Sequence, residues 1–167
     1  KKNYDWSRKK VKKLTKGQAA SHSRFLYFQR LSEKILGKTN ISLVIKLEKL
    51  YWQSFFKKMR LFSRALDFLK KCRESNIKIC LITDLTAKIQ FKKIEYLKIG
   101  KYLDFIVSSE EAGHDKPHPG VFRLALYKLK MRPQNVVLIG DNYKKDLVGG
   151  KRIGIKAILV NNNAQVY

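Results

Sequence analysis

The segment Leu138–Val160, LIGDNYKKDLVGGKRIGIKAILV, carries two aspartates in a strongly basic chain. The apolar residues of NVVLIG predict a buried strand that ends just before Asp141. A helix over KKDLVGGKRIG and a last strand over KAILV follow, so Asp146 lies about one helical turn beyond Asp141. Carboxylates at a strand tip are oxygen ligands of the kind that Mg²⁺ takes together with a phosphate.

The same alternation of strand and helix extends back to Leu61. LFSRALDFLKKCRES predicts a helix, IKICLIT a strand, AKIQFKKIEYLKI a helix that stops at Gly100, LDFIVSS a strand, and PGVFRLALYKLK a helix with proline in its first turn. This order predicts an α/β fold, with a Rossmann-like parallel sheet covered by helices on both faces. Ligands of such sheets bind beyond the carboxyl ends of the strands.

The first 60 residues have a different pattern. After the basic run KKNYDWSRKKVKKLTK, the period is helical from Gln18 to Met59. One helix would place Phe25, Phe28, Leu31 and Ile35 on one face and stop at Gly37; a second would align Leu43, Leu47, Leu50 and Ser54. We therefore expect a basic run and helical cap segment over 1–60 and an α/β core over 61–167.

Charge and cysteine content bound the function. Lys and Arg number 37 against 13 Asp and Glu, which gives a net charge of +24. Such a field attracts nucleic acid or anionic surfaces, although lysine-rich composition drift explains it equally simply. No apolar run is long enough to span a membrane, and no signal peptide is evident. Cys72 and Cys80 lack CxxC spacing and predict reduced thiols of an intracellular protein, in the cytoplasm or an organelle matrix.

Three predicted loops at the strand ends carry polar chemistry. Thr83 and Asp84 offer a hydroxyl and backbone N–H groups at a helix start, which suits an anion. Lys116 lies in the stiff loop EEAGHDKPHPGVF, and Asp141-Asn142 follows the third strand. Each has a structural alternative: Thr83 as a helix cap, Lys116 as a solvated lysine, and Asp141-Asn142 as turn formers. Asp146 could likewise sit on a helix dipole, and Gly149-Gly150 could serve close packing. Together, in chain order on consecutive strand ends, they favour a phosphate site.

This order of motifs resembles the haloacid dehalogenase (HAD) superfamily of phosphohydrolases over Leu61–Val160. LITD is similar to the second motif of the family, which implies that Thr83 is the phosphate-binding hydroxyl. KPHPGVF is similar to the third motif, in which Lys116 would neutralise charge. LIGDNYKKD is similar to the fourth, with Asp141 as a Mg²⁺ ligand and Asp146 supporting it. The resemblance implies a Mg²⁺-dependent phosphomonoester hydrolase acting on a small phosphorylated metabolite. Thr83, Asp84, Lys116 and Asn142 would then bind phosphate or substrate, and residues before Leu61 would form part of the substrate-selecting cap.

The first family motif, DxDxT, is absent from the chain, which contains no Asp-x-Asp. Its first Asp is the family's nucleophile, and its second the general acid/base. The resemblance puts that motif on a central strand, between the strands that end at Thr83 and Asp141 and ahead of Lys1. Without the strand, two apolar edges would be exposed, which proteins avoid. We expect an upstream segment, or else a strand of another chain, to fill the place.

Three hypotheses follow. The first is a HAD-type phosphatase whose nucleophile comes from outside the printed chain, with Arg24 and Tyr27 either facing the substrate or packing inside the cap. The second is a catalytically inactive HAD-like protein held in an RNA–protein assembly through its basic surface. The third, membrane-surface attachment through the N-terminal run, is disfavoured because the apolar face of that run is thin. His22, His114 and His118 are not expected to form a metal set by themselves. The sequence leaves the oligomeric state open.

Overall fold

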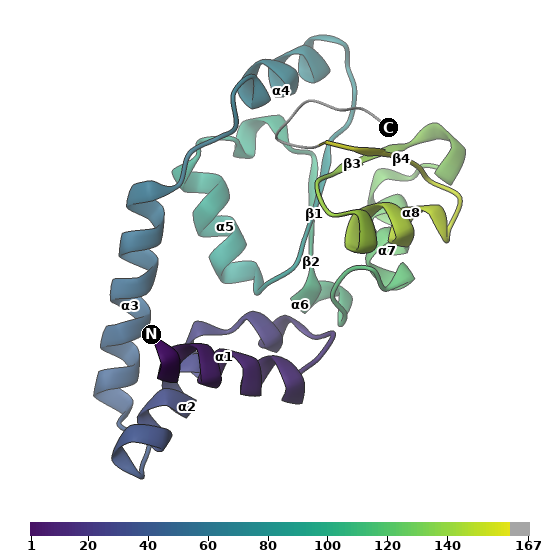
Figure 1. Ribbon diagram of the computed structural model, residues 1–167. Helices are drawn as coiled ribbons and strands as arrows, with labels where there is room; N and C mark the ends of the chain where they lie inside the picture. Colours follow the sequence, from purple (N-terminus) through teal and green to yellow (C-terminus); the bar gives the residue numbers. More distant parts are fainter. Residues whose placement is uncertain (161–167) are drawn as a thin grey trace.

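The strands form two separate parallel pairs in the computed structural model, which describes residues 1–160. β1 (Cys80–Thr83) pairs with β2 (Phe105–Ser108), and β3 (Val137–Gly140) pairs with β4 (Lys156–Leu159) (Figure 1). The expected α/β fold with parallel strands is confirmed. Within residues 1–160, however, no ladder joins the two pairs, so one edge of each strand lacks a partner.

Two apolar side chains of β3 are exposed, as expected for a strand that lacks a neighbour. Val137 is 51% exposed and Ile139 is 46% exposed, whereas strands of parallel sheets are ordinarily buried on both faces. All four residues of β1 are only half-buried. The prediction that an additional strand belongs between β1 and β3 agrees with this exposure.

The core helices form close to their predicted places, except that the short helix over Ser109–Ala112 lies in a segment predicted as a strand end and a loop. They are α4 (Ala65–Glu74), α5 (Ala87–Tyr96), α6 (Ser109–Ala112), α7 (Pro119–Leu129) and α8 (Val148–Lys151), with short 3₁₀ turns η2 (Gly100–Tyr102) and η3 (Pro133–Asn135) and one π turn, η4 (Tyr143–Leu147). Pro119 occupies the first turn of α7 as expected, and Nδ1 of His118 accepts the Gly120 N–H at 3.2 Å to cap that helix. The helix expected over KKDLVGGKRIG is divided between η4 and α8.

The first 58 residues form a helical module beside the core, at the carboxyl ends of β1 and β2 (Figure 1). It consists of α1 (Lys2–Leu14), the 3₁₀ turn η1 (Ala19–His22), α2 (Arg24–Leu36) and α3 (Ile41–Lys58). Gly37 ends α2 in a left-handed conformation, with φ 69°, as the sequence predicted. The domain boundary near residue 60 stays a prediction, and residues 161–167 of the expected core lie outside the described residues.

The buried faces of α2 and α3 differ from those predicted. Phe28 is buried, but Phe25 is 45% exposed and Leu50 is 48% exposed. Tyr27 is buried instead, because α2 packs against both α1 and α3 and the Tyr27 hydroxyl donates to the carbonyl of Ser21. Trp52 takes the corresponding place on α3. A hydrogen bond thus makes a tyrosine as suitable for the interior as the phenylalanine two residues before it.

Val107, Val121, Phe122, Ala125 and Ile155 form the buried centre of the α/β core. Cys72 is buried and Cys80 half-buried, and both are free thiols, as expected; burial raises the pKa of Cys80 to about 11. None of the helices in the described part of the chain is long and apolar enough to cross a membrane.

The glycine pair of α8 serves close packing. A Cβ on Gly149 would lie 2.3 Å from Cε2 of Phe122, well inside van der Waals contact. We expect Gly149→Ala to lower the free energy of unfolding by about 1–3 kcal/mol, because Phe122 is completely buried and must shift. Urea unfolding measures this loss. Gly100→Ala is the control, since its Cβ would meet Ile94 at an ordinary 3.5 Å; equal stability of the two variants would contradict the packing argument.

Candidate active site

Thr83 ends β1 with its hydroxyl already positioned. Its Oγ1 accepts a hydrogen bond from Nε2 of Gln90 at 2.6 Å, and the same amide donates to the carbonyl of Asp84 at 2.7 Å. Gln90 is buried on α5, so the turn after β1 is fixed from the helix side. The residue at the N-cap of α5 is Thr86, which excludes the capping alternative for Thr83.

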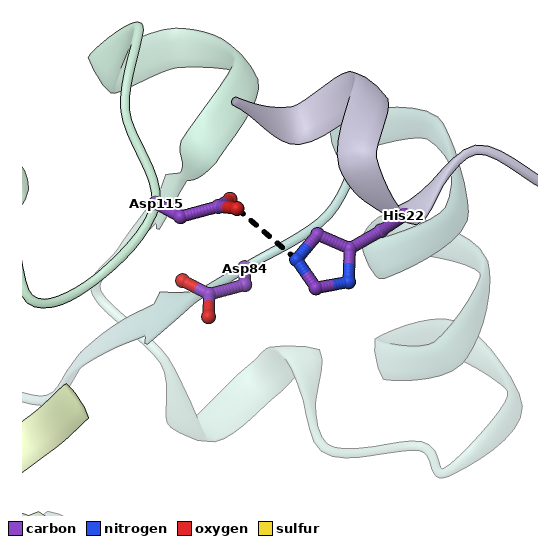
Figure 2. A group of neighbouring side chains, drawn as sticks. All are labelled: His22, Asp84 and Asp115. Atoms are coloured by element: carbon purple, nitrogen blue, oxygen red, sulfur yellow. Dashed lines mark hydrogen bonds and ion pairs between the residues drawn. The ribbon is translucent and has the colours of Figure 1, made fainter. Parts of the chain in front are cut away.

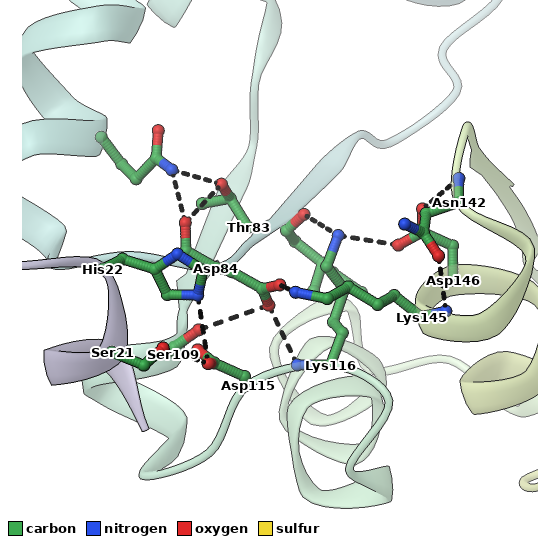
Figure 3. Close-up of polar contacts among 12 residues, drawn as sticks. Ser21, His22, Thr83, Asp84, Ser109, Asp115, Lys116, Asn142, Lys145 and Asp146 are labelled. Carbon is green, nitrogen blue, oxygen red and sulfur yellow. Dashed lines mark hydrogen bonds and ion pairs between the residues drawn. The ribbon is translucent and has the colours of Figure 1, made fainter. Parts of the chain in front are cut away.

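The Asp84 carboxylate connects three loops at the strand ends (Figure 3). Its Oδ1 accepts the backbone N–H of Lys116 at 2.9 Å, and its Oδ2 accepts Nζ of Lys145 at 2.6 Å. Ser109, which follows β2, lies with its hydroxyl 3.4 Å from Oδ1. The side chain of Asp84 therefore organises the site, and what it leaves for a ligand is the backbone of the turn.

Lys116 reaches between the ends of β1 and β3. Its Nζ lies 2.7 Å from Oδ1 of Asp146 and 3.4 Å from the carbonyl of Ile82 in β1 (Figure 3). Both partners of the ion pair are largely buried, with 15% of the Lys116 side chain and 5% of the Asp146 side chain exposed. The structure thus brings together the lysine and the second aspartate of the predicted constellation and excludes a freely solvated Lys116.

Asp146 is held against β3. Oδ2 of Asp146 accepts the Asn142 N–H at 3.0 Å. A Cβ added to Gly140 would lie only 2.5 Å from the Cβ of Asp146. Glycine at the end of β3 is therefore needed for the carboxylate to reach Lys116. The side chain of Asn142 caps η4 by accepting the Lys145 N–H at 3.0 Å, as a turn former does.

The two aspartates suit a metal ion unequally. Asp141 is exposed at the tip of β3, and its side chain makes no hydrogen bond or ion pair within residues 1–160, so its oxygens are available. Both oxygens of Asp146 already have partners. An exposed carboxylate such as Asp141 would suit a Mg²⁺ ion as a direct ligand, whereas Asp146 could support such an ion only indirectly, through the position of Lys116.

His22 joins the site from the helical module, which the sequence did not indicate. Its Nε2 lies 3.2 Å from Oδ2 of Asp115, and the Ser21 hydroxyl donates to the same oxygen at 3.0 Å. Burial alone would raise the pKa of Asp115, but hydrogen bonds from His22, Ser109 and Ser21 hold this pKa below its usual value. The ionised carboxylate stabilises the fold above the ordinary aspartate pKa, and this contribution is lost as pH falls through the lowered value.

Arg24 and Tyr27 pack inside the module, in line with the second of their two interpretations. The Arg24 guanidinium donates to the His22 carbonyl at 2.6 Å and to the Tyr51 hydroxyl at 3.0 Å, and it lies over the ring of Trp52. Tyr27 is only 1% exposed. Arg24 therefore helps to position His22 through the hydrogen bond to its backbone carbonyl.

His22, Asp84 and Asp115 could together hold a metal ion, since one ligand atom of each lies within 4.8 Å of the others (Figure 2). The surroundings oppose it. Oδ2 of Asp84 is already paired with the Lys145 ammonium group, and Oδ1 already accepts the backbone N–H of Lys116. A cation there would compete with the Lys145 ammonium group for Asp84, so the three side chains are better described as a polar cluster that connects the module to the core. His114 and His118 do not belong to this group; their rings stack on each other, with centroids 3.8 Å apart.

Comparison with known proteins identifies the family of the chain. Residues 3–160 match the haloacid dehalogenase-like hydrolase family. The chain is 35% identical to a ribulose-1,5-bisphosphate 5-phosphatase of Halopiger xanaduensis over 93% of its own length and 65% of that protein's, and 26% identical to a glyceraldehyde 3-phosphate phosphatase of Methanopyrus kandleri over 91% and 64%. It therefore spans slightly less than two thirds of these relatives.

Solved structures share the fold. A 2-haloacid dehalogenase from Pseudomonas syringae superposes with a TM-score of 0.74 at 17% identity, covering 99% of this chain and 71% of that one. A HAD phosphatase from Thermococcus onnurineus superposes with a TM-score of 0.64 at 21% identity, over 97% and 78%. With parallel strands and a family match over residues 3–160, the chain belongs to the haloacid dehalogenase-like hydrolases.

Proposed function

We propose that the protein is a Mg²⁺-dependent phosphomonoester hydrolase that acts on a small phosphorylated metabolite. The observation that carries the proposal is the placement of Lys116, fixed between Asp146 and the end of β1 and next to the Thr83 turn. A lysine held there by a buried carboxylate is aimed at one place and does not need to be reordered when an anion binds. The two relatives, a ribulose-1,5-bisphosphate 5-phosphatase and a glyceraldehyde 3-phosphate phosphatase, support the substrate class.

Each side chain has a separate part in the proposed reaction. The Thr83 hydroxyl and the backbone N–H groups of the following turn bind phosphate oxygens, while the Lys116 ammonium offsets the charge that gathers on the phosphoryl group. Asp84 and Asp146 are positioning residues, which hold Lys116 through its backbone and its side chain respectively. When bound at Asp141, Mg²⁺ would polarise a phosphoryl oxygen and neutralise its charge.

The nucleophile and the general acid come, in this proposal, from a strand that fills the place between β1 and β3. The missing ladder between the two pairs and the exposed side chains of Val137 and Ile139 support that place. A carboxylate at the carboxyl end of such a strand would lie next to Thr83, Lys116 and Asp141. The family resemblance puts the strand ahead of Lys1 in the same chain; a partner chain is the other source.

Turnover by the full-length protein tests the proposal. With Mg²⁺, incubation with a panel of sugar, nucleotide and glyceraldehyde phosphates should release inorganic phosphate, and a chelator should stop the release. A folded full-length protein that hydrolyses no member of the panel would end the proposal.

The net charge of +24 favours one second candidate, a HAD-like protein without catalysis in an RNA–protein assembly. Its lysines would neutralise backbone phosphates, so the affinity would fall steeply as salt is added. Filter binding at physiological ionic strength tests this candidate, and the absence of RNA affinity there would exclude it.

A further inference from the structure

A cavity of about 890 Å³ opens beside the candidate active site, between the end of helix α1 and the loop that holds Lys116. The basic N-terminal run, which the sequence left without a role, supplies one wall of it. Six of the lining side chains are basic: Lys12, Lys13, Lys16, Lys116, Lys145 and Arg152. Among the described residues, Asp115 is the only carboxylate in the lining, and it is paired with His22.

The cations fall into two groups. Lys116 and Lys145 are neutralised by Asp146 and Asp84, at the edge that the cavity shares with the active site. Lys12, Lys13, Lys16 and Arg152 have no ion-pair partner within residues 1–160. Burial and the neighbouring charges of Arg8, Lys145 and Arg24 lower the pKa of Lys12. These four side chains therefore add positive charge to a lining in which, among the described residues, Asp115 is the only carboxylate.

We propose that the cations of this cavity that have no ion-pair partner within residues 1–160 form a second anion subsite, which binds a second phosphate group of the substrate. The inference rests on the proposed function and narrows its substrate class to small metabolites that carry two phosphate groups. One phosphate lies at Thr83 and Lys116, where it is hydrolysed. The other lies among Lys12, Lys16 and Arg152, where it is held but not cleaved.

The shape of the site favours a small molecule over a polynucleotide. The positive charge lines a hollow of the volume typical of metabolite sites and is continuous with the catalytic lysine. Several equally exposed lysines of α1, such as Lys9 and Lys10, lie outside that lining. An extended RNA would use both sets, whereas a bound metabolite would use only those that line the hollow.

The test compares bisphosphates with monophosphates that are otherwise the same. The ligands are phosphate esters of short straight-chain diols of increasing length, with one or both hydroxyls esterified, so that no sugar recognition intervenes. Binding to the full-length protein is measured by calorimetry at about 0.15 M salt, where long-range attraction is screened. Mg²⁺ is omitted so that the esters are not consumed, and hydrolysis with Mg²⁺ is measured separately.

At one diol length or more, the bisphosphate should bind about tenfold tighter than the monophosphate, because a second phosphate gains charge-assisted hydrogen bonds. The double substitution Lys12→Ala with Lys16→Ala should remove most of that advantage and leave monophosphate binding unchanged. The matched control, Lys9→Ala with Lys10→Ala, removes the same charge from the same helix and should keep the advantage.

Three outcomes would overturn the inference. The first is equal affinity for both ester types at every length. The second is an equal loss in the two double variants, which would indicate only a diffuse field. The third is displacement of the bisphosphate by poly(U) through both lysine pairs, which would indicate an RNA surface. If monophosphates are hydrolysed but bisphosphates are not bound more tightly, the second subsite is excluded and the proposed phosphatase activity is retained. If no ester is bound or hydrolysed, the proposed function itself is excluded.

Discussion

Replacing Lys116 with methionine is expected to damage both turnover and stability. Without the ammonium group, the charge on the phosphoryl group loses its main fixed protein partner, and kcat should fall by about 10²–10³-fold. The substitution also leaves the Asp146 carboxylate buried without a counter-charge, which should lower the free energy of unfolding by about 3 kcal/mol. Phosphate release and urea unfolding of the same preparation measure the two effects.

Two further variants separate these effects. In Lys116→Met with Asp146→Asn the stranded charge is gone, so much of the stability should return while the activity stays low. Lys128→Met removes a lysine whose ion pair with Glu111 is more exposed, and it should change stability by less than about 1 kcal/mol. If Lys116→Met kept full activity, or if stability and activity always recovered together, Lys116 would have only a structural role.

The second large effect is expected at Asp141. Asp141→Asn should abolish both Mg²⁺ binding and turnover, because the neutral amide supplies a much weaker ligand than the carboxylate. Its stability should stay within about 0.5 kcal/mol of the parent, since the side chain is exposed and has no hydrogen-bond partner within residues 1–160. Calorimetric titration with Mg²⁺ gives the first result, and phosphate release the second.

Asp67→Asn is the control for Asp141→Asn. Asp67 is exposed on α4, where its substitution makes the same change in net charge without touching the site. It should bind Mg²⁺ and turn over as the parent does. Retained Mg²⁺ affinity in Asp141→Asn would show that the metal assignment is wrong, whatever happens to the activity.

The strand ends could be predicted from the sequence because their signals are local. Apolar runs gave β1 and β3, and parallel topology places the carboxyl ends of such strands on one side. The proximity of Lys116 and Asp146 therefore followed from order along the chain. The split into two pairs was also foreseeable, since no other segment of the core has the apolar pattern of a strand that could join them.

The parts that the sequence missed depend on contacts between distant segments. His22 and Asp115 meet only because η1 packs on the loop before Lys116, and neither segment has a periodicity that predicts this contact. Lys145 is one of many lysines, and nothing local distinguishes the one that binds Asp84. Tyr27 replaces Phe25 in the interior because a single carbonyl, that of Ser21, accepts its hydroxyl.

The central claim is that one more strand belongs between β1 and β3 and brings the nucleophile to Thr83, Lys116 and Asp141. Amide hydrogen exchange in the full-length, active protein tests it most directly, at those amides of β1 and β3 that do not point toward β2 or β4. Central strands exchange only through global opening, so these amides should be protected as strongly as Val107 in the core. Rapid exchange at those positions in a protein that still hydrolyses phosphate esters would contradict the account.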